Sequence, residues 1–272
     1  MSESLAGALR DCLAAGEAAA LVRVAGAKGS TPREAGASML VTAARTIGTV
    51  GGGRLEWEAA KAARALLDGG RQAARLDMPL GPELGQCCGG HVTLTVERAG
   101  PSMLAALEEM EAAERQARPA VLVFGAGHTG TALVRALSLL PYDIRWIDER
   151  EGFPGGGNCL AEIAAAPADA AYVVLTHSHG LDALICAAVL EREDFAYLGV
   201  IGSKTKRRQF ERGFRATGIA DATIARLTCP IGGNAVRDKR PEIIAALVAA
   251  ELVTVLAKAG RLAAMSQRGQ AA

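Results

Sequence analysis

Short apolar runs, separated by glycine, proline and polar residues, dominate the first hundred positions. From His91 to Glu97 apolar and polar residues alternate, as they do along a strand with one buried face. Between Arg54 and Leu67 the apolar residues recur at helical spacing, and Gly69-Gly70 follows as a helix C-cap would. Further apolar runs predict strands over 18–26, 37–42 and 72–76. The pattern therefore predicts a first domain that mixes helix and strand.

In the second half of the chain, apolar runs of strand length alternate with segments of helical spacing. The predicted strands cover 121–124, 144–147, 171–176 and 197–201. Of the predicted helices, the first ends at Leu140, the next two cover 181–191 and 203–217, and the last begins at Pro241. Such alternation is typical of a parallel sheet covered by helices. We therefore expect a Rossmann-like second domain.

The predicted fold class is α/β, with two domains and a helix between them. The expected boundaries are 1–100 for the mixed α/β domain, 101–118 for a linker helix, 119–265 for the Rossmann-like domain and 266–272 for a polar tail. A charged, alanine-rich pattern from Met103 predicts the linker helix. Arg118-Pro119 marks its end, because the residue before a proline avoids helical geometry.

Composition narrows the functions open to the chain. Its 272 residues, 50% of them apolar, are enough for two cores. The net charge is +1, from 30 Lys and Arg against 29 Asp and Glu, so no global field would attract nucleic acid or an anionic membrane. No secretion signal or uncharged membrane-spanning stretch is evident. We expect a cytoplasmic protein with no nucleic acid or membrane partner.

The cysteines, at 12, 87, 88, 159, 186 and 229, do not follow the spacing of a disulfide scaffold, so we expect reduced thiols. Gln86-Cys87-Cys88-Gly89-Gly90, just before a predicted strand, is the least ordinary feature of the first domain. One interpretation is buried, inert sulfur. The other is a thiolate stabilised by exposed backbone N–H groups, which could bind a soft metal or attack a sulfur species.

A short apolar strand runs into Gly125-x-Gly127-x-x-Gly130, and Asp148 ends the next apolar run. In dinucleotide-binding folds the first glycine allows a tight turn, the second lets a pyrophosphate approach the chain, and the third lets the helix pack on the strand. N–H groups at the start of that helix face the anion. Asp148 would accept hydrogen bonds from vicinal hydroxyls. These residues predict a site for an anion or a nucleotide-like ligand.

Three polar clusters follow predicted strands of the second domain, where open α/β sheets place ligands. They are Thr176-His-Ser-His179, Gly202-Ser-Lys-Thr-Lys-Arg-Arg208 and Cys229-Pro-Ile-Gly-Gly233. Zinc at His177 and His179 is disfavoured, because the spacing departs from the His-x-His-x-Asp-His motif of metallo-β-lactamase-type hydrolases. Ser203 can cap a phosphate-binding helix, with Lys204 reaching the anion. We expect residues 206–208 to form a solvated helix face.

Two loops of the first domain also carry features suited to binding. The loop from Lys28 to Gly36 is polar, and its glycines and proline exclude regular structure. The triple glycine from Gly51 to Gly53 opens the predicted helix, which makes it a second potential anion cradle.

Eight motifs stand in order along the chain: Gly29-Ser-Thr-Pro-Arg-Glu-x-Gly36, Gly51-Gly-Gly-Arg-Leu-Glu56, Gln86-Cys-Cys-Gly-Gly90, Val123-Phe-Gly-Ala-Gly-His-x-Gly130, Trp146-Ile-Asp148 with Phe153-Pro154, Thr176-His-Ser-His179, Gly202-Ser-Lys-x-Lys-Arg207 and Cys229-Pro-Ile-Gly232. Together they resemble the xanthine dehydrogenase accessory protein family of the XdhC/CoxI type, over almost the whole chain. The doubled cysteine resembles the cysteine pair of family members that serve xanthine dehydrogenase. The stretch 232–240 is less similar, so we transfer no role to it.

The resemblance implies a non-catalytic assembly factor with a CoxI-like first domain and a Rossmann second domain. Such a protein binds the molybdenum cofactor, molybdopterin, and protects it while a cysteine desulfurase supplies the terminal sulfur ligand. It then helps to insert the cofactor into the molybdenum subunit of apo xanthine dehydrogenase. Family members tend to self-associate, so we expect a homo-oligomer, a dimer.

Each part of that cofactor has a receptor in the sequence. The glycine turn suits a phosphate or nucleotide tail, Asp148 suits a ribose or a pterin N–H edge, and Cys88 suits molybdenum, because thiolate is a soft ligand. The predicted cofactor-binding residues are Gln86, Cys87, Cys88, Gly89, Gly125, Gly127, Gly130, Asp148, Ser203 and Lys204, with Cys88 as the metal ligand.

Two other functions stay open. An NAD-dependent oxidoreductase would place Asp148 on the adenosine ribose, but fold analogy alone cannot establish such an activity. A sulfur-transfer or nucleotidyl-transfer enzyme could use Cys87 or Cys88 as a persulfide carrier, because a thiolate that binds molybdenum could also bear sulfur.

Overall fold

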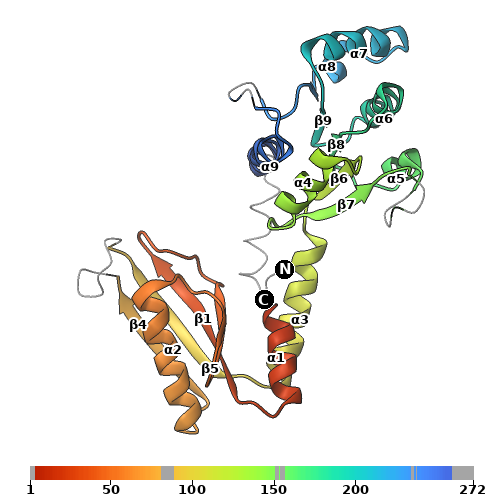
Figure 1. Cartoon of the computed structure of the whole chain (residues 1–272). Helices are drawn as coiled ribbons and strands as arrows, with labels where there is room; N and C mark the ends of the chain where they lie inside the picture. The colour runs from red at the N-terminus through yellow and green to blue at the C-terminus, as the bar shows by residue number, and fades with distance from the viewer. Residues whose placement is uncertain are drawn as a thin grey trace. The chain divides into compact units, whose positions relative to one another are not determined.

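The structure is a computed structural model that describes residues 4–80, 89–150, 153, 157–233, 236 and 238–258. The chain divides between Gln116 and Ala117 into two compact units, which we call unit 1 and unit 2 (Figure 1). Each has its own sheet and its own buried clusters.

Unit 1 is built on a five-stranded antiparallel sheet in the order β3-β2-β1-β5-β4 (Figure 1). Its elements are α1 (Leu5–Ala14), β1 (Ala19–Lys28), β2 (Ser38–Thr42), β3 (Thr46–Gly48), α2 (Gly53–Asp68), β4 (Ala73–Pro79), β5 (His91–Arg98) and α3 (Pro101–Gln116). The predicted strands and helices of this half are confirmed.

The two faces of this sheet are covered by different helices. Alternate residues of β1 point to opposite faces, so Val22 packs with α2 whereas Leu21 packs with α1 and α3. The predicted linker helix forms as α3, and its buried Leu107 belongs to the same cluster as α1. Burying a leucine side chain contributes about 1.5–3 kcal/mol. This contact gives α3 a role in the core of unit 1.

Unit 2 is built on a five-stranded parallel sheet in the order β10-β9-β8-β6-β7 (Figure 1). Its elements are β6 (Ala120–Phe124), α4 (His128–Leu137), β7 (Asp143–Ile147), α5 (Cys159–Ala164), β8 (Ala171–Val174), α6 (His179–Arg192), β9 (Tyr197–Val200), α7 (Lys204–Ala216), α8 (Asp221–Ile224), β10 (Leu227–Thr228) and α9 (Pro241–Lys258). The predicted α/β class and the Rossmann-like parallel sheet are confirmed.

Strands β6, β8 and β9 are buried on both faces, which explains their continuous apolar runs. Phe124 packs with α5 and α6 on one face, whereas Val123 packs with α4 and α9 on the other. Among the described helices, none is both long and apolar enough to cross a lipid bilayer.

Candidate functional site

The glycine turn after β6 lies at the point where the strand order reverses. From β6 the chain goes to β7 on one side and then to β8 on the other, and the carboxyl ends of β6 and β8 are neighbours. Open parallel sheets bind their ligands in the crevice at such a switch point. The fold therefore places the predicted anion site where this architecture binds ligands.

The three glycines of the turn have different structural roles. A Cβ on Gly125, whose φ is +112°, would lie 2.4 Å from the carbonyl oxygen of Leu175. A Cβ on Gly130 would lie 2.0 Å from the carbonyl oxygen of Gly125. A Cβ on Gly127 would have no heavy atom within 4 Å. Thus Gly125 and Gly130 are required for packing, whereas Gly127 faces open space.

The start of α4 fits the expected anion site. Gly127 is the N-cap residue, and among the described residues no side chain caps the start of the helix. These N–H groups and the helix dipole favour an anion at this end. An anion could therefore approach the open side of Gly127.

Asp148 closes the turn, and both oxygens of its carboxylate accept hydrogen bonds from the protein itself. Its Oδ2 accepts a hydrogen bond from the N–H of Ala126 at 2.6 Å. The guanidinium of Arg150 donates to both carboxylate oxygens, from Nε at 2.7 Å and from Nη2 at 3.0 Å. The N–H of Arg150 donates as well, at 3.0 Å. A ligand hydroxyl would have to displace Arg150 to reach the carboxylate.

These contacts change the acidity of Asp148. Burial would raise its pKa, but the hydrogen bonds from Arg150 and Ala126 outweigh burial and lower the pKa from 3.8 to about 2. Because the pKa of Asp148 is lower in the folded state than in the unfolded state, the ionised carboxylate stabilises the fold at every pH above the unfolded-state pKa. That stabilisation is lost as the pH falls from about 4 to about 2.

We expect Asp148→Asn to lower the free energy of unfolding by about 1–2 kcal/mol at neutral pH and to have a much smaller effect at about pH 2.5. Urea unfolding of both proteins at the two pH values measures the difference. Asp143→Asn is the control, because Asp143 is exposed at the start of the same strand. An equal loss for Asp148→Asn at both pH values would contradict the assignment.

The second feature of this edge is a buried ion pair between α6 and α7. Lys206 Nζ lies 2.5 Å from Asp182 Oδ2, and the two side chains are only 7% and 1% exposed. The expectation of a solvated face over residues 206–208 is therefore wrong for Lys206. Its side chain points inward because α7 packs its 206, 210 and 214 positions, one helical stripe, against the core.

The ion pair connects two of the predicted polar clusters. Asp182 Oδ1 accepts hydrogen bonds from Thr176 N at 3.1 Å and Thr176 Oγ1 at 2.6 Å, in the loop after β8. Lys206 Nζ also donates to the carbonyl oxygen of Ile201 at 2.8 Å, after β9. A Cβ on Gly202 would lie 2.6 Å from Lys206 Cδ, so the loop rests directly on the lysine. The pair thus fixes both loops at the ligand edge of the sheet.

The other predicted residues of this edge are at the surface. Ser203 caps α7, as expected, by accepting a hydrogen bond from the N–H of Lys206 at 3.2 Å. Lys204, His177 and His179 are exposed. Within the described ranges, no three His, Cys, Asp or Glu side chains form a group that could hold a metal ion. Lys204 is therefore free to meet an anion from solvent.

In unit 1, the loop from Lys28 to Gly36 contacts the glycines that follow the cysteine pair. Ser30 and Gly89 form an isolated β-bridge, and a Cβ on Gly90 would lie 2.3 Å from the carbonyl oxygen of Ser30. Gln86, Cys87 and Cys88 lie outside the described residues. The described chain therefore brings Gly89, the neighbour of Cys88, to Ser30.

The triple glycine lies against the same loop. A Cβ on Gly51 would lie 2.6 Å from Pro32 Cγ. The predicted anion cradle is partly occupied by the protein itself, because Glu56 Oε2 accepts hydrogen bonds from Gly52 N at 3.0 Å and Thr49 Oγ1 at 2.6 Å. This internal carboxylate already uses one donor of the cradle.

The four described cysteines, Cys12, Cys159, Cys186 and Cys229, are buried free thiols, in agreement with the expected reduced state. Burial raises the pKa of Cys159 to about 12, and raises that of Cys186 and Cys229 as well. These thiols are protonated near neutral pH and are poor nucleophiles or metal ligands. Cys87 and Cys88 therefore stay the candidates for a reactive thiolate.

Comparison with known proteins agrees with this two-unit arrangement. Residues 12–77 match the model of the XdhC and CoxI family, and residues 121–252 match that of the XdhC Rossmann domain. The chain belongs to the XdhC and CoxI family. The glycine turn, Asp148 and the polar clusters lie within the XdhC Rossmann match, whereas the cysteine pair falls between the two matched segments.

One sequence relative and one solved structure are similar to this XdhC chain over most of its length. The chain is 30% identical over 256 residues to YqeB of Escherichia coli (strain K12). The matched segment covers 87% of this chain but only 43% of YqeB. The chain thus spans less than half of that relative. A Bacillus halodurans crystal structure described as a xanthine dehydrogenase has the same fold, with a TM-score of 0.75 and 17% identity over 95% of this chain and 96% of that one.

Proposed function

We propose that this protein is a chaperone that binds the molybdenum cofactor, protects it during sulfuration and helps to insert it into xanthine dehydrogenase. Membership of the XdhC and CoxI family supports a role in xanthine dehydrogenase maturation. The cofactor itself, a cysteine desulfurase partner, a non-catalytic role and self-association as a dimer are further parts of the proposal.

The observation that carries the proposal is the glycine turn of unit 2. Open space beside Gly127 and an uncapped helix start suit the phosphate or nucleotide tail of the cofactor. Lys204 is exposed at the start of α7, on the same edge of the sheet. When bound, the cofactor supplies a soft molybdenum centre that a thiolate can ligate. This chain would contribute the anion-binding glycine turn and the thiol.

The main alternative is an NAD-dependent oxidoreductase. That function would use Asp148 to hold the adenosine ribose, but the carboxylate is already bound by Arg150 and Ala126. This pairing counts against ribose recognition by Asp148, whereas the glycine turn and the start of α4 stay open to an anion. Adding NAD or molybdopterin to the purified protein, and following the fluorescence change, distinguishes the two ligands.

The thiol is tested by Cys88→Ser. The change keeps a side chain of similar size but replaces a soft thiolate by a hydroxyl that stays protonated near neutral pH. We expect the melting temperature to stay within a few degrees, and molybdopterin retained per chain to fall at least about tenfold. Oxidising the retained cofactor to its fluorescent product measures the loss. Cys87→Ser, assayed alongside, identifies which of the two thiols is used.

Cys12→Ser is the matched control, because Cys12 is buried in α1 and belongs to none of the motifs. It should lower stability by about 1–3 kcal/mol without a specific effect on the cofactor. Full retention and full transfer to apo xanthine dehydrogenase in both Cys87→Ser and Cys88→Ser would refute the thiol assignment. Failure of the unchanged protein to retain any molybdopterin would refute the proposed function as a whole.

A further inference from the structure

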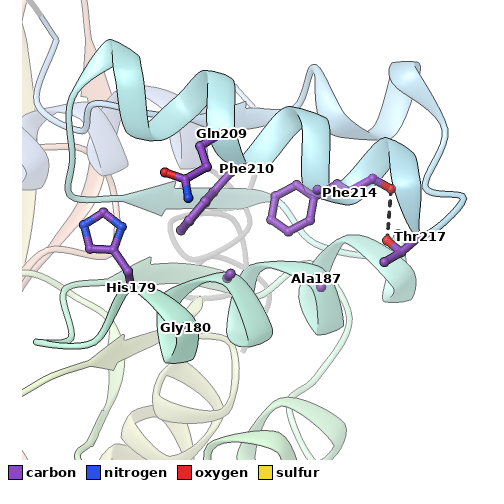
Figure 2. Close-up of a pocket in the computed structure, with 9 residues that line it drawn as sticks. His179, Gly180, Ala187, Gln209, Phe210, Phe214 and Thr217 are labelled. Carbon is purple, nitrogen blue, oxygen red and sulfur yellow. Dashed lines mark hydrogen bonds between the residues drawn. The ribbon is translucent and has the colours of Figure 1, made fainter.

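A pocket opens beside the carboxyl ends of β9 and β10 in unit 2, and we call it the β9–β10 pocket. Its volume is about 340 Å³, within the roughly 300–1,000 Å³ of small-molecule sites. Residues 201–202 line it after β9, residues 230–233 after β10, and Ile244 and Leu247 from α9. Other hollows of this unit, such as the groove between α6 and α7 in Figure 2, are lined mainly by the flanking helices. The β9–β10 pocket lies instead at the edge where parallel sheets bind ligands.

The lining of this pocket is mostly apolar. Two charged residues also line it, Asp238, which is paired with Arg240, and Lys239. The apolar side chains are those of Ile201, Pro230, Ile231, Val236, Ile244 and Leu247. Apolar walls with a few polar groups are typical of sites for ring-shaped ligands.

The loops that bound the pocket are fixed by the protein itself. Gly202 rests on Lys206, whose Nζ donates to the carbonyl oxygen of Ile201 at 2.8 Å. In the loop after β10, the N–H of Gly232 donates to Glu251 Oε2 at 2.7 Å. A pocket that is shaped before binding loses less conformational freedom when a ligand enters.

Backbone N–H groups supply a further polar part of the lining. Within the described chain, the N–H groups of Gly202 and Gly233 donate to no protein acceptor. A Cβ on Gly233 would have no heavy atom within 4 Å, so this part of the loop is open. Unused N–H groups beside apolar walls can donate hydrogen bonds to the polar edge of a heterocyclic ring.

The pocket lies within reach of the glycine turn. In the order β10-β9-β8-β6-β7, β9 is two strands away from β6. Adjacent strands are about 4.8 Å apart, so the carboxyl ends of β6 and β9 are about 10 Å apart. Helices α4 and α9 also pack in one cluster on the same face of the sheet. A ring joined through a few bonds to a phosphate at Gly127 would therefore reach the pocket.

We infer that the β9–β10 pocket binds the pterin ring of the cofactor whose phosphate lies at the glycine turn. The apolar walls contact the faces of the ring, and the N–H groups of Gly202 and Gly233 donate to acceptors on its edge. The nicotinamide ring of NAD is the rival occupant. It would require the adenosine half to be held on the other side of β6, where the carboxylate of Asp148 is paired with Arg150. The inference rests on the proposed function for the identity of the ligand.

Titration with 6-hydroxymethylpterin, a pterin without phosphate or metal, tests the pocket directly. An aromatic ring shifts the NMR signals of methyl groups that lie against its faces. In protein with isotope-labelled isoleucine methyl groups, we expect the signals of Ile201 and Ile244 to shift. Ile243 is the internal control, because it is half-buried at the start of α9 but does not line the pocket. Shifts confined to other isoleucines, or shifts of Ile201 and Ile244 with nicotinamide mononucleotide but not with the pterin, would overturn the inference.

Ile244→Ala removes part of the apolar wall. We expect its affinity for 6-hydroxymethylpterin to be at least about fivefold weaker than that of the unchanged protein. Ile243→Ala is the matched control, because it makes the same change at the adjacent half-buried position, and it should bind like the unchanged protein. Melting curves establish that both variants are folded. Equal affinities of the two variants would contradict the assignment of the pocket.

The outcomes separate this inference from the proposed function. If the unchanged protein retains molybdopterin but the pterin leaves the signals of Ile201 and Ile244 in place, the ring binds elsewhere and the chaperone function stands. If the pterin shifts these signals but molybdopterin is not retained, the pocket stands as a pterin site and the proposed function is wrong. If neither is observed, both are wrong.

Discussion

Lys206→Met is expected to lower the free energy of unfolding of unit 2 by about 3–5 kcal/mol, because it leaves the carboxylate of Asp182 buried without its cation. Asp182 would keep only the two hydrogen bonds from Thr176. Urea unfolding followed by circular dichroism measures the loss. The loops after β8 and β9 should become more accessible to proteolysis, because both are fixed by this pair.

The double variant Asp182→Asn with Lys206→Met separates charge burial from packing. Asparagine can still accept from Thr176, and no buried charge is left, so we expect the double variant to recover a large part of the stability. Lys204→Met is the control, since Lys204 is exposed and should change stability by no more than about 0.5 kcal/mol. Equal effects of Lys204→Met and Lys206→Met would show that the ion pair contributes nothing.

Gly130→Val is expected to lower the stability of unit 2 by at least about 3 kcal/mol. Its Cβ would lie 2.0 Å from the carbonyl oxygen of Gly125, and no rotamer can relieve a clash between a Cβ and the backbone. Helix α4 would have to move away from β6. Thermal unfolding measures this effect, and molybdopterin retention should fall with it.

Gly127→Ala is the informative counterpart in the same turn. Its added methyl group enters open space, so the melting temperature should stay within a few degrees, whereas anion approach should be hindered. Retention of molybdopterin should therefore fall without a loss of stability. If Gly130→Val melted like the unchanged protein, or Gly127→Ala retained the full amount of cofactor, the division of roles between the two glycines would be wrong.

Periodic apolar patterns were sufficient to predict most of the fold. The alternation over His91 to Glu97 gives β5, and the unbroken apolar runs give the buried parallel strands. Elements of two to six residues, such as β10, α8 and α5, are too short to show a period, so their existence depends on tertiary packing. The same holds for β3, which has three residues.

The candidate site was only partly predictable, because pairing partners are set by the fold. Asp182 and Lys206 are 24 positions apart and meet only when α6 and α7 pack side by side. Lys206 lies in a run of basic residues, and only its spacing of four and eight positions from Phe210 and Phe214 distinguishes it from its more exposed neighbours. Arg150 follows Asp148 by two positions, and its return to the carboxylate depends on the chain direction after β7. The glycine turn was predictable because its three glycines follow a strand and open a helix at a recognisable spacing.

The two edges of the unit 1 sheet affect how copies of the protein can meet. Strand β3 has only three residues, and β4 carries the exposed charges Arg75 and Asp77 and ends at Pro79, which has no N–H to donate. Short edge strands, charges and proline all oppose the addition of a further strand. Neither edge is suited to sheet extension, so unit 1 is protected from edge-to-edge aggregation, and a contact between copies through unit 1 would have to form through side-chain surfaces.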